Sequence, residues 1–237
     1  MNTPPSPGHA TIPSKLGIEM SRHVLIFLIL ALPAAGQDGW LHLDSPAHFR
    51  PLADRSWTFE NQTFTTVRDP RILEDLTTKD TFDNFELTLD WRIDPGGNSG
   101  VKHHITEEIF LIHEKPGYLQ GRRASRAELP PGGRGQNYLR GLEFQLLDDQ
   151  RHPDGARGRN RHTGALYNKL APTASPALPP GEWNTLLLRV HRGRLEHWVN
   201  GQQVLSAPVS GPPSPISLQN HADSIAQFHN IRIRRLD

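Results

Sequence analysis

Apolar and polar residues alternate along much of the chain, which is typical of strands that bury one face. Residues 85–93 (FELTLDWRI) and 142–147 (LEFQLL) show the pattern most clearly. Near the C-terminal end, Asn200-Gly201 is a strong signal for a tight hairpin turn. The pattern predicts strands over residues 57–60, 63–67, 85–93, 142–147, 185–191, 195–199, 203–205, 216–219 and 228–233.

Turn residues separate these predicted strands, and no segment keeps a helical period over several turns. The 20 Gly and 21 Pro are scattered singly, as in β-sandwiches. Two stretches lack a pattern, residues 113–140 and 148–182, and are expected to be irregular and either functional or solvated surface. The fold class predicted is all-β, an antiparallel two-sheet jelly-roll sandwich of the concanavalin A-like type.

The N-terminal part of the chain predicts a leader rather than a folded element. In residues 20–36 (MSRHVLIFLILALPAAG) a short basic head precedes an apolar run and the small residues of a cleavage site near Gly36. The apolar run is too short to span a bilayer. We therefore expect residues 1–36 to be a leader and signal peptide, and residues 37–237 to be one exported domain, secreted or periplasmic, without an integral membrane segment.

Charge and cysteine content narrow the classes of partner. The whole chain has 26 Lys and Arg against 25 Asp and Glu, and removing residues 1–36 leaves equal numbers of each. Such a balance does not favour nucleic acid, whose binders carry a basic surface. With 0 Cys, a metal ion would need His, carboxylate, carbonyl or amide ligands. No nucleotide-binding glycine pattern occurs, so no organic cofactor is expected.

The strand over residues 142–147 carries the first candidate chemistry. Its apolar residues alternate with Glu143 and Gln145, which must face away from the core. After Asn98-Ser99-Gly100, the same alternation places Lys102 and His104 on one face. A carboxylate and amides side by side on strands are typical of a ligand face, since sugar sites need planar polar groups. The alternative is a row of ordinary solvent-facing positions.

An acidic cluster follows this strand, at Asp148, Asp149, His152 and Asp154. Closely spaced oxygen ligands suit a hard divalent ion, although a solvated acidic turn explains the same residues. His221 stands between Asn220 and Asp223 and is a further polar candidate. One divalent metal ion (Ca²⁺, Mg²⁺ or Mn²⁺) is a candidate cofactor, with Glu143, Asp148 and His221 as its candidate ligands.

Nine short segments follow one another in a fixed order along the chain, at residues 75–78, 84–92, 98–100, 141–148, 163–167, 181–184, 196–201, 218–221 and 228–231. Taken together, these segments resemble the 3-keto-disaccharide hydrolase domain family, which has the concanavalin A-like (laminin G-like) sandwich. The chain departs from that family's pattern at His104 and His229, where Arg is usual, and at Ala222, where Gly is common.

The resemblance implies an enzyme that cleaves the glycosidic bond of sugars already oxidised at C3. A C3 ketone acidifies the C2 proton, so elimination followed by hydration, or hydrolysis, can proceed with one base, a stabilised enolate and a donor to the leaving oxygen. A divalent metal could serve as the electrophile. The resemblance leads us to expect catalytic roles for Glu143, His104, Lys102 and Asp148, and substrate binding by Asn98, Gln145, Tyr167, Gln219 and His221.

Two other functions fit the same fold. The domain could be a non-catalytic carbohydrate-binding (lectin-like) module, since one sandwich serves both roles. It could also be an ordinary glycoside hydrolase with two carboxylates, such as Glu143 and Asp148. All three readings share a carbohydrate partner, and the sequence does not fix the oligomeric state.

Overall fold

The structure is a computed structural model that describes Met1 and residues 39–52, 55–115, 119 and 121–237. The predicted signal peptide lies outside the described residues, so export stays a prediction. In the part of the chain that is described, no helix has the length and apolar character needed to cross a membrane. The regular elements among the described residues from 39 onward are the strands of two sheets and a few short 3-10 turns.

The larger sheet has eight strands in the order β12-β11-β10-β6-β14-β3-β2, with β1 paired to β14. The pairings within it are antiparallel, and the sequence-predicted hairpin at Asn200-Gly201 lies in it, as does a second hairpin at Asn61-Gln62. Its strands are β1 (Leu41–His42), β2 (Trp57–Glu60), β3 (Thr63–Thr66), β6 (Phe85–Ile93), β10 (Asn184–His191), β11 (Arg194–Val199), β12 (Gln202–Pro208) and β14 (Ala226–Arg235).

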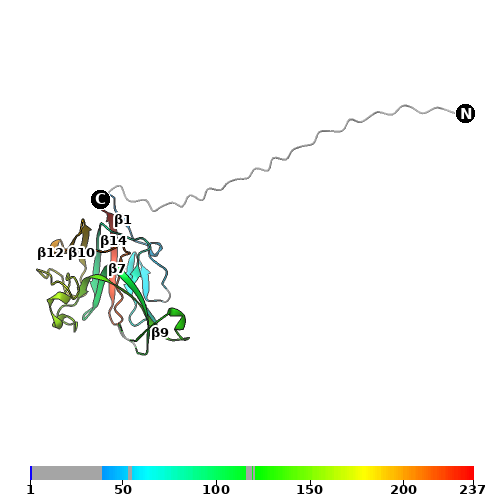
Figure 1. Ribbon diagram of the computed structural model, residues 1–237, viewed down its shortest axis with the longest axis horizontal. Coiled ribbons are helices and arrows are strands. Elements are labelled where there is room, and N and C mark those ends of the chain that lie inside the picture. The colour runs from blue at the N-terminus through cyan, green and yellow to red at the C-terminus, as the bar shows by residue number, and fades with distance from the viewer. Residues whose placement is uncertain (2–38, 53–54, 116–118, 120) are drawn as a thin grey trace. The chain divides into compact units, whose positions relative to one another are not determined.

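The smaller sheet has six strands in the order β4-β9-β7-β13-β5, with β8 paired to β7. In Figure 1 its long green strands β7 and β9 overlie the red strand β14 of the larger sheet. Only the short pairing of β4 with β9 is parallel among the described strands. The strands are β4 (Ile72–Glu74), β5 (Leu76–Thr77), β7 (Asn98–His113), β8 (Arg122–Ala124), β9 (Arg134–Leu147) and β13 (Ser217–Leu218).

The core lies between the two sheets because alternate residues of each strand face inward. From β10, Leu186, Leu188 and Val190 pack into it, and Phe144 and Leu146 do so from β9. Each of these side chains is at most 3 % exposed. The predicted two-sheet all-β sandwich is therefore confirmed. The helical elements are the 3-10 turns η1 (Pro46–His48), η2 (Arg126–Glu128), η3 (Gly155–Arg157) and η4 (Arg159–Arg161).

One stretch that was expected to be irregular is strand in part. The prediction for residues 113–140 is wrong where β8 forms and where β9 begins, at Arg134. Residues 134–140 (RGQNYLR) show no apolar alternation, yet they pair with β7 along one edge and in part with β4 along the other. Backbone pairing rather than side-chain pattern therefore forms the first half of β9. By contrast, residues 148–182 form no strand, as expected, and contain turns, bends, η3, η4 and isolated β-bridges at Leu166 and Leu170.

Candidate active site

A polar hollow of about 400 Å³ opens on the face of the smaller sheet that is turned away from the core. Strands β7 and β9 form its floor, and the loop after β9 and the segment after β13 form its walls. It brings together six of the sequence-predicted residues from four separate parts of the chain. Its lining residues are Asn98, Leu119, Tyr138, Glu143, Gln145, His152, Pro153, Asp154, Arg157, Tyr167, Gln219 and His221.

Glu143 lies in the floor of this hollow, where the alternation of β9 places it. Its neighbour Phe144 is fully buried in the core, so Glu143 must point to the opposite face. Gly100 on the adjacent strand β7 makes room for it, since a Cβ at position 100 would lie 2.4 Å from Glu143 Oε1. The glycine of the Asn98-Ser99-Gly100 segment is therefore required for close approach of this carboxylate.

The surroundings of Glu143 tune it to titrate near neutral pH. Removal of water from its carboxylate raises the pKa to about 7, with Lys102 opposing that rise and Asp75 adding to it. Gln219 donates a hydrogen bond to the carboxylate and lowers the pKa slightly. A carboxyl group with such a pKa can accept and return a proton at physiological pH.

Lys102 lies beside Glu143 in the β7–β9 register but does not line the hollow. Its ammonium is buried against Asp75 Oδ2 at 2.7 Å and stands 4.7 Å from the centre of the Tyr138 ring. The other oxygen of Asp75 accepts a hydrogen bond from the backbone N–H of Asn220 at 3.0 Å. This ion pair therefore ties β7 to the segment that carries Gln219 and His221, and it influences Glu143 through its charges.

A chain of amides and an imidazole forms one side of the floor. The Gln145 amide donates to Asn98 Oδ1 at 2.9 Å, and Asn98 Nδ2 lies 3.4 Å from His152 Nε2. Gln145 Oε1 is buried and has no hydrogen-bond donor among the described residues. Because an unpaired buried acceptor is costly, this oxygen is suited to accept from a hydroxyl group of a ligand.

Tyr167 reaches the hollow because its segment extends the sheet beside β9. Its backbone N–H donates to the carbonyl of Glu143 at 2.9 Å, and its hydroxyl donates to Asp154 Oδ2 at 2.6 Å. Asp154 is also held by Arg157 at 2.7 Å and Arg161 at 3.1 Å. Burial and the Asp154 carboxylate both raise the pKa of Tyr167, so the phenol stays protonated.

Two histidines stand at the edge of the hollow. The ring of His221 lies edge-on to that of His152 with centres 5.6 Å apart, and His221 Nδ1 is 2.8 Å from Asp223 Oδ1. Burial, and next the charge of His221, lower the pKa of His152. His152 Nδ1 already accepts a hydrogen bond from the backbone N–H of Asp154 at 3.1 Å. Only Nε2, which lies beside the Asn98 amide, is therefore left to meet a ligand.

Two residues with expected catalytic roles lie elsewhere. The expectation that His104 shares a face with Lys102 is wrong, because His104 has φ +47° at an irregularity where the alternation of β7 breaks. Its ring instead lies 2.7 Å from His103, Nδ1 to Nδ1, and against Gly211. Asp148 accepts backbone hydrogen bonds from Gly96, Gln150 and Arg151, so its carboxylate holds a turn outside the hollow.

The three candidate metal ligands do not come together as a set. Glu143 and His221 line the hollow, but Asp148 does not. Across the described residues, no group of three or more His, Asp or Glu side chains is placed to hold a metal ion. We therefore derive no chemical step through a metal, and the predicted divalent ion stays a prediction.

The hollow also contains residues to which the sequence pattern gave no catalytic or substrate-binding role. Tyr138 lies in the half of β9 without alternation, and Arg157 lies in η3 of the loop. His152 and Asp154 were singled out only as part of an acidic cluster. The short spacing from Asp148 to Asp154 suited a metal-binding loop or a solvated acidic turn, and nothing in it indicated that Asp154 would pair with Tyr167.

Comparison with solved structures identifies proteins of similar architecture. Two candidate glycosyl hydrolases from Parabacteroides distasonis match with TM-scores of 0.59 and 0.57 at 24 % and 23 % identity. They cover 83 % and 84 % of this chain, and 99 % and 89 % of their own. At this level of identity the likeness concerns the fold alone.

Comparison with characterised sequences gives a closer relationship. A 3-keto-disaccharide hydrolase of Bacteroides thetaiotaomicron is 32 % identical over 126 residues, which is 52 % of this chain and 38 % of that protein. The chain thus matches well under half of that relative's length. The family model described as a 3-keto-alpha-glucoside-1,2-lyase-like domain matches residues 37–234, nearly all of the predicted domain. The chain therefore belongs to the family of 3-keto-alpha-glucoside-1,2-lyase-like domains.

Proposed function

We propose that this domain cleaves the glycosidic bond of a sugar that carries a ketone at C3, by elimination and then hydration. The observation that carries the proposal is the contrast between the two carboxylates of the hollow. Glu143 has a pKa of about 7 and faces the open volume. Asp154 is occupied by Tyr167, Arg157 and Arg161. One tunable base suits elimination better than the acid–nucleophile pair of an ordinary glycosidase.

In the first half of the proposed reaction Glu143 removes the C2 proton of the sugar. The C–H electrons form an enolate across C2 and C3, and its collapse restores the ketone, forms a C1–C2 double bond and breaks the bond from C1 to the leaving oxygen. The proton that Glu143 gained passes to that oxygen. A carboxyl group with a pKa near 7 serves both directions of transfer.

In the second half water adds across the new double bond. Glu143 takes a proton from the water as its oxygen bonds to C1, and returns a proton to C2. Donors around the hollow stabilise the enolate oxygen, and the Asn98 amide and the Arg157 guanidinium are the groups we assign to it. Gln145 Oε1 and the Tyr167 hydroxyl oxygen accept from the hydroxyl groups of the sugar.

The competing functions are separated by one substrate comparison. Purified protein is incubated with methyl glucoside and with methyl 3-keto-glucoside, each with and without a chelator. Release of methanol from the keto form alone supports the proposal. Release from unoxidised glucoside supports a two-carboxylate glycosidase, and binding without release supports a lectin-like module. Loss of activity with chelator that returns on adding Ca²⁺, Mg²⁺ or Mn²⁺ would establish the predicted metal requirement.

A further inference from the structure

Three of the five tryptophans are only partly buried and lie outside the core, at the larger sheet. Trp40 is covered by Arg234, whose guanidinium is 4.7 Å from the ring centre. Trp183 is covered by Arg92 at 4.6 Å and meets the ring of His229. Trp198 differs, because its ring has no aromatic or cationic partner among the described residues, and its buried indole N–H has no acceptor there.

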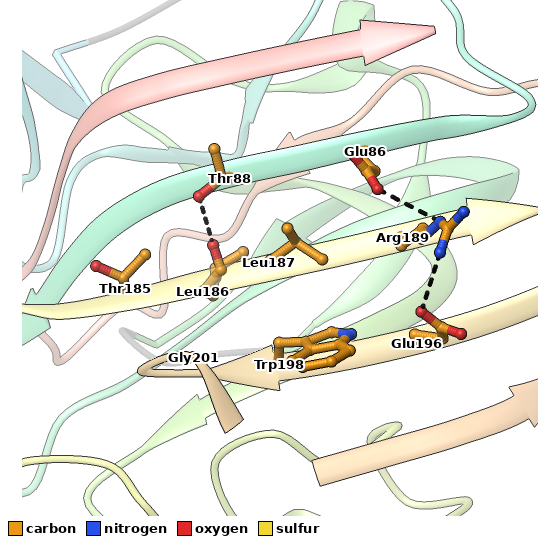
Figure 2. Close-up of a pocket in the computed structure, with 9 residues that line it drawn as sticks. All are labelled: Glu86, Thr88, Thr185, Leu186, Leu187, Arg189, Glu196, Trp198 and Gly201. Carbon is orange, nitrogen blue, oxygen red and sulfur yellow. Dashed lines mark hydrogen bonds and ion pairs between the residues drawn. The ribbon is translucent and has the colours of Figure 1, made fainter. Parts of the chain in front are cut away.

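The uncovered ring of Trp198 forms one wall of a hollow of about 320 Å³ on the outer face of the larger sheet. Figure 2 shows this hollow across β6, β10 and β11. Strand register places Thr88, Leu187 and Trp198 in one row across the three strands. A flat aromatic wall beside a small apolar floor is suited to the apolar face of a sugar ring.

A second row, of charged residues, borders the first. Arg189 Nε lies 3.4 Å from Glu86, and its Nη1 lies 3.7 Å from Glu196. Dashed lines in Figure 2 mark both pairs. Arg234 donates to Glu86 at 2.6 Å as well. Because the carboxylates and guanidinium groups pair with one another, the border has little net charge but many donors and acceptors. Such a border complements a neutral polyhydroxylated ligand rather than an anion or a cation.

We infer that this hollow is a second carbohydrate site, which binds a neutral mono- or disaccharide unit unoxidised at C3 and performs no chemistry on it. The sugar stacks on Trp198, and its hydroxyl groups bond with Glu86, Arg189 and Glu196. The hollow's volume is near the lower end of the ~300–1,000 Å³ usual for small-ligand sites. The core separates it from the Glu143 hollow, since the two lie on the outer faces of different sheets. The inference therefore does not rest on the proposed reaction.

The test measures binding of cellobiose and maltose by calorimetry, on the full chain carrying Glu143→Gln so that no turnover occurs. Trp198→Ala removes the stacking wall, and Trp198→Tyr keeps a ring. Leu187→Arg fills the hollow from a partly exposed position, so it tests the site even if Trp198→Ala folds poorly. Trp183→Ala is the matched control, because it removes a tryptophan of the same face that Arg92 already covers.

We expect a millimolar or tighter dissociation constant for one of the two probes, weakened roughly tenfold or more by Trp198→Ala and by Leu187→Arg. Trp198→Tyr and Trp183→Ala should stay within about threefold of the parent. Cleavage of a 3-keto-glucoside by the chain with native Glu143 should be unchanged by Trp198→Ala, so failure of this site and failure of the proposed reaction give different results.

Three outcomes would overturn the inference. The first is no binding of either probe at about 10 mM, the weakest range that calorimetry resolves. The second is binding that Trp198→Ala and Leu187→Arg leave unchanged. The third is a dimeric parent that Trp198→Ala converts to a monomer by light scattering, which would assign this face to a second copy of the chain.

Discussion

Glu143 and Glu86 lie on long strands, and each projects from its sheet away from the core. Glu86 on β6 is engaged by Arg234 and Arg189. Glu143 on β9 faces an open hollow, and the nearby cation Lys102 is already paired with Asp75. The local sequence pattern is the same in both places. What differs is whether guanidinium groups from neighbouring strands pair with the carboxylate. This separates a carboxylate without a catalytic role from a candidate catalytic one.

The largest effect that tests this comparison is on turnover. Glu143→Gln keeps the shape and removes the proton acceptor, so we expect kcat/KM on a 3-keto-glycoside to fall by at least about 100-fold. Glu86→Gln should leave kcat/KM within about threefold, because Glu86 lies on the other sheet. Steady-state kinetics on both variants checks this. Equal losses in the two variants would remove the distinction.

Stability should change in opposite directions in the same two variants. The Glu143 pKa is raised from 4.5 to about 7 in the folded protein. The free energy of unfolding therefore falls as pH rises through that window, and the full loss of stability is reached above about pH 7. At pH 8 we expect Glu143→Gln to stabilise by on the order of 2 kcal/mol. Glu86→Gln should destabilise by about 1 kcal/mol, since it weakens the partly exposed arginine pairs. Urea unfolding at pH 8 measures both, and a destabilised Glu143→Gln would contradict the account.

The pH dependence of activity sharpens the comparison further. A base with a pKa of about 7 must be ionised, so kcat/KM should fall below pH 7, by up to about tenfold per pH unit. Asp75→Asn removes a negative charge that raises the Glu143 pKa, and it also removes the carboxylate that pairs with Lys102. Both changes should lower the Glu143 pKa, so the fall in kcat/KM should move to lower pH. A pH–rate profile of each protein provides the test. A flat profile between about pH 5 and 8 would exclude Glu143 as the titrating base.

A smaller effect on kcat/KM is expected from removing the tyrosine hydroxyl that donates to Asp154, the second carboxylate of the hollow. Tyr167→Phe removes the hydroxyl that donates to Asp154 and, in our proposal, accepts from the sugar. We expect kcat/KM to fall by about tenfold, mainly through KM, with the pH limb unmoved. Tyr138→Phe is a matched control from the same hollow. If Tyr167→Phe instead displaces the pH limb, Tyr167 takes part in the proton transfer that we give to Glu143.

The sequence allowed the sheets to be predicted where side chains alternate, as at β6 and in the second half of β9. It did not allow the first half of β9 to be predicted, because Gly135, Gln136 and Asn137 are held by backbone pairing on both sides. Glu143 and Gln145 could be placed on the outer face from alternation alone. His104 could not, since alternation gives no sign of its positive φ.

Asp148 shows a different limit of the sequence pattern. It follows β9 directly and could have been a ligand, but its oxygens accept from the backbone of Gly96 and of the turn that follows. A carboxylate used for a turn and one used for chemistry look the same in a single sequence. The pairing of Tyr167 with Asp154 depends on how a long loop folds back over β9, and neither residue's neighbours along the chain indicate it.

The most direct measurement of the central claim is the fate of the C2 proton. The protein cleaves a methyl 3-keto-glucoside in D₂O, and the sugar released is examined by NMR before spontaneous exchange, which is followed in product without protein. Elimination and hydration by Glu143 predict one deuterium at C2 in the first product formed. In Glu143→Gln, both the turnover and the incorporation of deuterium at C2 should be lost. Rapid cleavage that leaves the original proton at C2 would contradict the account.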